Sequence, residues 1–245
     1  MNSISPNLNI MIKACEKASK ALIRDFGEVE KLQVSIKGPL DFVTNADLKA
    51  EKIIITELQK NKKKYSILSE EIGLIKNEDK NNFWIIDPID GTTNFLHGIP
   101  HFATSIAFVS KNEIISGIIY DPVKDEMFYA EKNNGAFLNN KRIRVSRKKD
   151  LDNCLFATGG ENKKFELLTR RSGSAALDMA YVACGRFDGY FQNNLSLWDV
   201  AAGHILIKEA GGIVNEIDFS YTKNLNIKAS NNIINTKMLA KIKNF

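Results

Sequence analysis

The chain has 245 residues, of which 44% are hydrophobic and 26% are charged. These values exclude a disordered or fibrous chain, and the length allows one large domain or two small ones. The net charge of +5 comes mainly from scattered lysines. One basic cluster lies at residues 141–149, which we interpret as a solvated surface rather than a nucleic-acid site.

The cysteines and the apolar segments indicate the cellular compartment of the protein. Cys15, Cys154 and Cys184 lie far apart and form no pairing or metal-ligand pattern, which is typical of a reducing compartment. The first residues contain no basic segment followed by an apolar run, and no apolar run reaches the roughly 18 residues of a membrane span. We therefore expect a cytoplasmic protein that does not contact a membrane.

The first part of the chain predicts two helices followed by a series of strands. Ser5 and Pro6 are typical of a helix start, and apolar residues then recur at helical spacing to about Gly27. A loop is expected at 37–41 and a second helix after Thr44. Strands are expected at 65–69, 84–86, 102–109, 113–120, 126–131, 135–138 and 142–145. The polar residues 73–82 are interpreted as a flexible excursion between two of them.

A domain boundary is expected near Ser146, dividing the chain into 1–146 and 147–245. The second part predicts alternating strands and helices. In chain order the expected elements are a strand at 151–157, a turn at 158–164, a helix at 177–184, a strand at 187–191, a helix at 198–211, strands at 213–217 and 226–229, and a helix at 235–243.

Acidic residues follow two successive predicted strands. Glu70 and Glu71 come after the strand at 65–69, and Asp87 and Asp90 come after the strand at 84–86. Ligands of open α/β sheets bind at the carboxyl ends of strands. Carboxylates presented together at such an edge favour a divalent cation, so the sequence predicts a shared metal site.

The turn after Asp90 suits a phosphate. Gly91, Thr92 and Thr93 stand at the start of a predicted helix, where free backbone N–H groups bind anions. Acids beside a phosphate would repel it unless a divalent metal lies between them. The stretch therefore predicts a Mg²⁺-dependent phosphoryl site, while the alternative is an acidic turn in which an aspartate caps the helix.

Two further aspartates have the same two interpretations. Asp47 follows Thr44 at capping-box spacing, and Asp199 lies in the first turn of its helix, where the helix dipole favours a carboxylate. Either could instead serve the metal site, Asp47 by orienting water and Asp199 as a ligand. We interpret His97 and His101 as loop residues, because neither has a partner at metal-ligand spacing.

Several motifs together resemble those of the inositol monophosphatase family, a group of magnesium-dependent phosphatases. They are Glu70-Glu71, the run at 84–95, the run at 198–203 and the run at 209–212. They occur in the family's order and at about its spacing, and the resemblance covers nearly the whole chain. It implies a layered αβαβα sandwich with an α+β N-terminal half and an α/β C-terminal half. It also implies an active site between the halves and often a homodimer.

The resemblance implies a set of metal ligands. Glu70, Asp87 and the backbone carbonyl of Ile89 would hold a first Mg²⁺, and Asp87, Asp90 and Asp199 a second. A third, weaker Mg²⁺ would use Glu70 and water. Catalysis would be hydrolysis by a metal-activated water, with the ions clamping the attacking and leaving oxygens.

The resemblance also implies catalytic and substrate-binding roles. Thr92 together with Glu70 would orient and activate the attacking water, with Asp47 hydrogen-bonding around them. The backbone N–H groups of Gly91 and Thr92 would bind the phosphate. The substrate-binding residues would be Asp90, Gly91, Thr92, Gly173, Ser174, Ala175, Gln192 and Asp199.

Two features depart from the family pattern. Gln192 stands where inositol-specific members usually carry a glutamate that accepts hydrogen bonds from substrate hydroxyls. A glutamine can still accept through its oxygen, but it has lost the charge and gained donors. The segment at 156–170 is also short, with room for little more than a turn where family members commonly have a further helix.

The resemblance implies a phosphomonoesterase for a small polyol or sugar phosphate, with inositol monophosphate as the default substrate. Histidinol phosphate, fructose 1,6-bisphosphate and a 3′-phosphoadenosine nucleotide are alternatives. A different class of function is an accessory role in transcription or ribosomal RNA synthesis, through RNA or RNA polymerase factors. The basic cluster at 141–149 is the feature that could favour RNA, and it is a weak signal.

Overall fold

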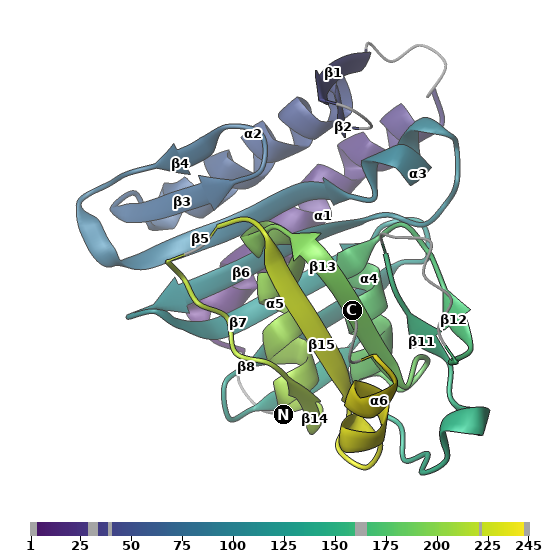
Figure 1. Ribbon diagram of the computed structural model, residues 1–245. Helices are drawn as coiled ribbons and strands as arrows, with labels where there is room; N and C mark the ends of the chain where they lie inside the picture. The colour runs from purple at the N-terminus through teal and green to yellow at the C-terminus, as the bar shows by residue number, and fades with distance from the viewer. Residues whose placement is uncertain (1–3, 29–33, 39–40, 160–165, 221, 243–245) are drawn as a thin grey trace.

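The computed structural model describes residues 4–28, 34–38, 41–159, 166–220 and 222–242. In residues 34–38 and 41–44 it describes the backbone alone. Its elements stack in five layers (Figure 1). The first layer holds α1 (Pro6–Phe26) and α2 (Asn45–Asn61), and a large sheet follows. Then come α4 (Ala175–Ala183) and α5 (Leu197–Glu209), a small sheet, and α6 (Asn235–Lys241).

The large sheet carries the first acidic strand ends. Its strands, in spatial order, are β10 (Lys141–Arg142), β9 (Gly135–Leu138), β8 (Glu126–Glu131), β7 (Glu113–Asp121), β6 (Ala103–Ser110), β5 (Asp79–Asp90), β3 (Tyr65–Ser69) and β4 (Gly73–Ile75). Its pairs are antiparallel except that β3 and β5 run parallel. The carboxyl ends of β3 and β5 therefore meet at one edge, which brings Glu70 and Asp87 to the same place.

The small sheet lies on the other side of α4 and α5. Its order is β12 (Thr169–Arg170), β11 (Phe156–Ala157), β13 (Gly189–Leu195), β15 (Leu225–Asn231) and β14 (Gly212–Val214). The remaining elements are β1 (Val34–Gly38) paired with β2 (Asp41–Thr44), the short helix α3 (Thr92–Leu96) and a 3₁₀ turn η2 (Leu151–Asn153).

Side chains alternate along the central strands and so build two cores. In β5, Ile86 packs with α1 and α2, whereas its neighbour Ile85 packs with α4 and α5. Successive side chains of a strand point to opposite faces, so a continuous apolar run is what a sheet covered on both faces requires. One cluster also joins strands of the large sheet to β13 and β15. The boundary near Ser146 remains a prediction.

The helix α5 is buried on nearly every side because it lies between the two sheets. Its first turn carries Asp199, which lies close to Asp87 and Asp90 at the end of β5. The helix approaches β7 so closely that a Cβ at Gly117 would lie 2.8 Å from the Cα of Ala202. The absence of a side chain at Gly117 therefore sets how near α5 comes to the sheet.

Most expected elements form, and the exceptions have local causes. The residues at 73–82 are an extension of the sheet rather than a flexible excursion, because β4 pairs with β3 and β5 already begins at Asp79. The Asp79 carboxylate accepts from the N–H groups of Asn81 and Asn82, which fixes that polar stretch. Of the residues expected in a loop at 37–41, 37 and 38 belong to β1 and 41 begins β2, and the two strands pair.

The segments on either side of residue 146 are less regular than expected. β10 ends at Arg142, and the chain then turns toward α5, where the N–H of Val145 donates to the carbonyl of Ala210. The strand expected at 151–157 is the turn η2 followed by the two-residue strand β11. Most of the turn expected at 158–164 and the Thr44 side chain lie outside the described residues.

Replacing Gly117 with alanine tests how α5 is seated. The added methyl group meets backbone atoms of Ala202, which cannot move aside singly. We expect the free energy of unfolding to fall by about 1–3 kcal/mol, measured by urea denaturation. Gly27→Ala is the control, because Gly27 has an ordinary φ of −69° and the nearest atom to its added Cβ is 3.4 Å away. Equal stability of Gly117→Ala and the wild type would contradict this account.

Candidate metal centre

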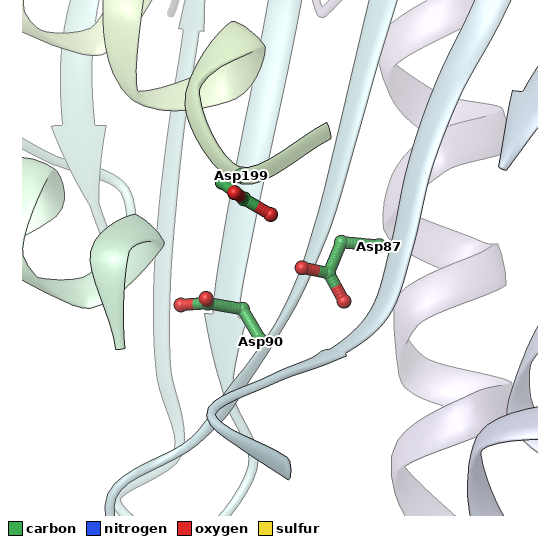
Figure 2. A group of neighbouring side chains, drawn as sticks. All are labelled: Asp87, Asp90 and Asp199. Carbon is green, nitrogen blue, oxygen red and sulfur yellow. The ribbon is translucent and has the colours of Figure 1, made fainter. Parts of the chain in front are cut away.

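Three aspartates meet where β5 ends and α5 begins. Asp87 and Asp90 come from the end of β5 and Asp199 from the first turn of α5. One carboxylate oxygen of each lies within 4.8 Å of the others. Figure 2 shows the three side chains gathered in the space between these two elements. The structure thus brings together residues that are separated by more than a hundred positions in the sequence.

Asp87 has the most unfavourable environment of the three. It is 2% exposed, and its Oδ1 has no hydrogen-bond partner among the described residues. Burial, and then the charges of Glu70, Asp90 and Asp199, raise the pKa of Asp87 well above its usual range. Buried carboxylates are ordinarily stabilised by hydrogen bonds or by a positive charge, and within the described part of the chain the Oδ1 of Asp87 has no such hydrogen bond.

Asp90 and Asp199 are held in place by hydrogen bonds. The Oδ2 of Asp90 accepts from the Ser174 hydroxyl and from the N–H of Ala176, the latter at 2.8 Å. Burial raises the pKa of Asp90 to about 6 against the effect of these bonds. The Oδ2 of Asp199 accepts from the N–H of Ser196 at 2.7 Å. Burial and then the charge of Asp90 raise the pKa of Asp199 to about 7.

This donor set fits a hard divalent cation. All three side chains offer oxygen ligands, they converge, and each would ionise more readily if a positive charge lay between them. The uncompensated Oδ1 of Asp87 is the clearest sign of the fit, because a ligating ion would satisfy it. The helix-cap interpretation also holds for Asp199, whose bond to the N–H of Ser196 leaves its second oxygen for the cluster.

Two of the other predicted residues, Glu70 and Thr92, contact the segment that carries Asp87 and Asp90. Glu70 directly follows β3, and its N–H donates to the carbonyl of Ile86 at 3.1 Å, one residue before Asp87. The Thr92 hydroxyl donates to the carbonyl of Ile89 at 3.0 Å, so the expected nucleophile-orienting group and the expected carbonyl ligand touch. Asp47 is fully buried in the first turn of α2, which packs on the same sheet.

Glu51, which was not predicted from the sequence, shapes the turn that carries Glu70. Glu51 is fully buried, and its Oε1 accepts from the Ser69 hydroxyl and from the N–H groups of Glu71 and Ile72. A carboxylate from α2 thus binds the side chain of the residue before Glu70 and the backbone of the two residues after it. The available signal was an acid on the apolar face of a helix, four residues after Asp47.

Asn94 connects the metal cluster to the expected substrate-binding turn. Its amide nitrogen donates to the carbonyls of His101 and Ser172, each at 2.8 Å. Gly173 has a φ of +85°, and a Cβ there would lie 2.9 Å from that nitrogen. The turn at 173–175 therefore needs glycine at its start. The role of Asn94 was not predicted, although the residue lies within the motif at 84–95.

The expected substrate-binding residues of the C-terminal half line one cavity with the metal cluster. The cavity has a volume of about 380 Å³ and contains Asp90, Asp199, Gln192 and the turn at 173–175. Asp178 also lines it and was not predicted. It is 2% exposed and accepts from the Ser172 hydroxyl, and burial raises its pKa to about 8.

Part of the basic cluster at 141–149 has an internal role. The Lys148 ammonium lies 2.9 Å from the buried carboxylate of Asp188 and donates to the carbonyl of Asn153. The Ser146 hydroxyl donates to the same carboxylate. These contacts tie the segment after β10 to the small sheet. They account for Lys148 without a nucleic acid.

A family model described as the inositol monophosphatase family matches residues 4–244. The chain belongs to this family. The layered fold with two sheets is likewise that of solved family structures. Within the described residues, no helix is both long and apolar enough to cross a membrane.

Relatives within the family carry two kinds of name. The chain is 46% identical over 254 aligned residues to an inositol-1-monophosphatase of Mesorhizobium japonicum, covering 96% of each chain. It is 40% identical over 256 residues to the Nus factor SuhB of Escherichia coli, covering 97% of this chain and 96% of the relative. The crystal structure of the extragenic suppressor protein suhB from Bartonella henselae superposes with a TM-score of 0.92 at 46% identity, covering 98% and 99% of the two chains.

Asp178 gives the metal-free protein a specific pH dependence. Its folded-state pKa of about 8 exceeds its ordinary value of 3.8, so between these values the folded chain binds more protons than the unfolded chain. Stability must therefore fall as pH rises through this window. We expect Asp178→Asn to flatten the dependence by up to about 1.4 kcal/mol per pH unit. Urea unfolding in a chelator from about pH 5 to 8 measures it, and parallel slopes would show that Asp178 is not responsible.

Proposed function

We propose that the protein is a Mg²⁺-dependent phosphomonoesterase that hydrolyses a small polyol or sugar phosphate. The observation that carries this proposal is the convergence of Asp87, Asp90 and Asp199 within 4.8 Å. Two of these residues also line the cavity that contains the turn at 173–175. Membership of the inositol monophosphatase family supports the same reaction and makes inositol monophosphate the default substrate.

The metal ligands of the proposal are those that the family resemblance implies. Glu70, Asp87 and the carbonyl of Ile89 would hold one Mg²⁺, and Asp87, Asp90 and Asp199 another, with a weaker third at Glu70. Such ions act as Lewis acids and neutralise the carboxylates and the phosphoryl group. Without that neutralisation, burial raises the pKa of all three aspartates, and the charges of neighbouring acids raise it further for Asp87 and Asp199.

Thr92 and Glu70 would orient the attacking water. The Thr92 hydroxyl donates to the carbonyl of Ile89, which leaves its oxygen lone pairs to accept a hydrogen bond from water. Glu70 would take up the proton, and Asp47 would hydrogen-bond around this pair. The alignment of the water with the phosphorus atom is the chain's main contribution, since phosphoryl transfer depends on positioning and charge stabilisation.

Gly91 and Thr92 would bind the phosphate through their N–H groups. Gly91 has a φ of +98° and lies against the backbone of His101 and Gly173, where a side chain would be 3.1 Å from the nearest carbonyl. The close backbone approach leaves no room for a side chain at Gly91. A phosphate oxygen can then reach the amide hydrogens directly.

The remaining features of the proposal are expectations from the sequence and from the family resemblance. We propose a cytoplasmic homodimer, divided near Ser146 into two domains that together form the site. Histidinol phosphate, fructose 1,6-bisphosphate and 3′-phosphoadenosine nucleotides are the alternative substrates.

A second candidate function is an accessory role in transcription or ribosomal RNA synthesis. It rests on the 40% identity to a relative named Nus factor SuhB. The basic cluster adds little to it, because Lys148 bonds within the chain. Such binding would not need the aspartate cluster, so phosphatase assays of aspartate variants separate the two functions.

Asp87→Asn tests the proposed reaction directly. The substitution preserves shape and removes the charge of a carboxylate whose Oδ1 has no hydrogen-bond partner among the described residues. We expect Mg²⁺-dependent phosphate release to fall on the order of 10³-fold, which corresponds to about 4 kcal/mol of transition-state stabilisation. The metal-free variant should unfold no more easily than the wild type, because a buried charge has been removed.

The matched control is Asp152→Asn, the same change at an exposed residue of η2. It should keep wild-type turnover. Undiminished turnover in Asp87→Asn, with an unchanged dependence on Mg²⁺ concentration, would refute the assignment.

A further inference from the structure

The cavity beside the metal cluster is lined by an amide whose orientation is fixed by a hydrogen bond within the protein. Gln192 lies in β13, is partly exposed and lines the cavity. Its Oε1 accepts a hydrogen bond from the Tyr190 hydroxyl at 2.8 Å. The Oε1 atom of Gln192, which could have replaced a glutamate oxygen as the acceptor for substrate hydroxyls, is thus already hydrogen-bonded within the protein.

The Tyr190 hydroxyl is buried, so losing its acceptor, the Oε1 of Gln192, would be costly. The whole Tyr190 side chain is fully buried, and Gln192 is the one hydrogen-bond partner of its hydroxyl within the described part of the chain. Burial and then the charges of Asp178, Asp90 and Asp199 hold the pKa of Tyr190 well above its usual range, so the hydroxyl keeps its proton. If the Gln192 amide were reversed, this buried O–H would face a second donor and have no acceptor.

Gly159 closes the same side of the amide. A Cβ built at Gly159 would lie nearer to Oε1 of Gln192 than to its Nε2, and both would be in collision with it. The oxygen is therefore enclosed between the Tyr190 hydroxyl and the Gly159 backbone. The group that Gln192 offers to the cavity is its NH₂, which donates hydrogen bonds and cannot accept them.

The charges around the cavity favour the same kind of ligand. Asp90 and Asp199 belong to the metal cluster, and Asp178 accepts from the Ser172 hydroxyl. Arg171 also lines the cavity and brings a positive charge. Away from the metal cluster, the cavity therefore combines a donor amide with a guanidinium, a pairing that suits anionic oxygens.

We propose that this cavity selects phosphomonoesters that carry a second anionic group, a phosphate or a carboxylate, at the end that meets Gln192. Gln192 is then a specificity-determining residue, and Tyr190 is the positioning residue that turns its amide. The selection narrows the substrate range away from an uncharged polyol such as inositol monophosphate. This inference rests on the proposed phosphatase function.

Matched substrate pairs test the inference on the wild-type protein with Mg²⁺. Fructose 1,6-bisphosphate is compared with fructose 1-phosphate, and 6-phosphogluconate with glucose 6-phosphate, with myo-inositol 1-phosphate as the uncharged-polyol reference. We expect kcat/KM to be at least about tenfold higher for the member of each pair with the second anion, mainly through a lower KM. The two pairs separate a second phosphate from a carboxylate.

Gln192→Glu should reverse this preference. A carboxylate there would still accept from Tyr190, and its second oxygen would repel an anion and accept from a substrate hydroxyl. We expect the ratio within each pair to fall by at least about tenfold and myo-inositol 1-phosphate to gain relative to both bisphosphate and phosphogluconate. Gln59→Glu, the same change in α2 away from this cavity, should leave every ratio as in the wild type.

Tyr190→Phe separates positioning from packing. Without the hydroxyl, the amide of Gln192 can turn its oxygen to the cavity, so the second-anion preference should shrink through KM while kcat changes less. A wild type without preference for the second anion, or ratios that Gln192→Glu leaves unchanged, would overturn the inference. Failure to release phosphate from any of the five substrates with Mg²⁺ would instead contradict the proposed phosphatase function.

Discussion

The structure is organised around the mutual repulsion of three aspartates that the fold forces together. Buried carboxylates are costly, and burial raises the pKa of each of the three. The charges of Asp90 and Asp199 raise the pKa of Asp87 further, and the charge of Asp90 raises that of Asp199. A sequence under selection for stability alone would replace such a cluster with apolar residues. Its presence at the edge of a cavity indicates a site that is completed by a cation, at the expense of the stability of the metal-free chain.

Much of the surrounding architecture holds these charges in place. Asp87 and Asp90 are fixed by β5, which is buried on both faces between two helical layers. Asp199 depends on how closely α5 lies against the large sheet, and hence on the lack of a side chain at Gly117. Hydrogen bonds from Ser174 and Ala176 then connect Asp90 to the second half of the chain. The geometry of the metal site therefore depends on how the layers pack against each other.

The sequence predicted the layered fold through its resemblance to the inositol monophosphatase family. It predicted a shared metal site because acids follow two successive strands, and because the motif at 84–95 belongs to that resemblance. Sequence reasoning failed where pairing over long distances decides the structure. The polar residues around Asp79 gave no sign that they join the sheet. Glu51, Asn94 and Asp178 looked like ordinary helix residues until the fold brought Ser69, Ser172 and the turn at 173–175 to them.

Gln192 shows the same limit at the level of a single amide. The sequence established that a charge is missing at this position, but it left open whether the oxygen or the nitrogen meets the substrate. That choice is made by Tyr190 and Gly159, which contact Gln192 from two directions. In the function we propose, the aspartate cluster would serve the reaction and the amide would serve the selectivity.

The central claim, that the three aspartates form a divalent-cation site, is tested most directly by anomalous diffraction from crystals soaked in Mn²⁺ as a substitute for Mg²⁺. The account predicts an anomalous peak between Asp87, Asp90 and Asp199, bonded to the Oδ1 atom of Asp87 that has no hydrogen-bond partner among the described residues. Crystals that bind Mn²⁺ elsewhere while this position stays empty would contradict it.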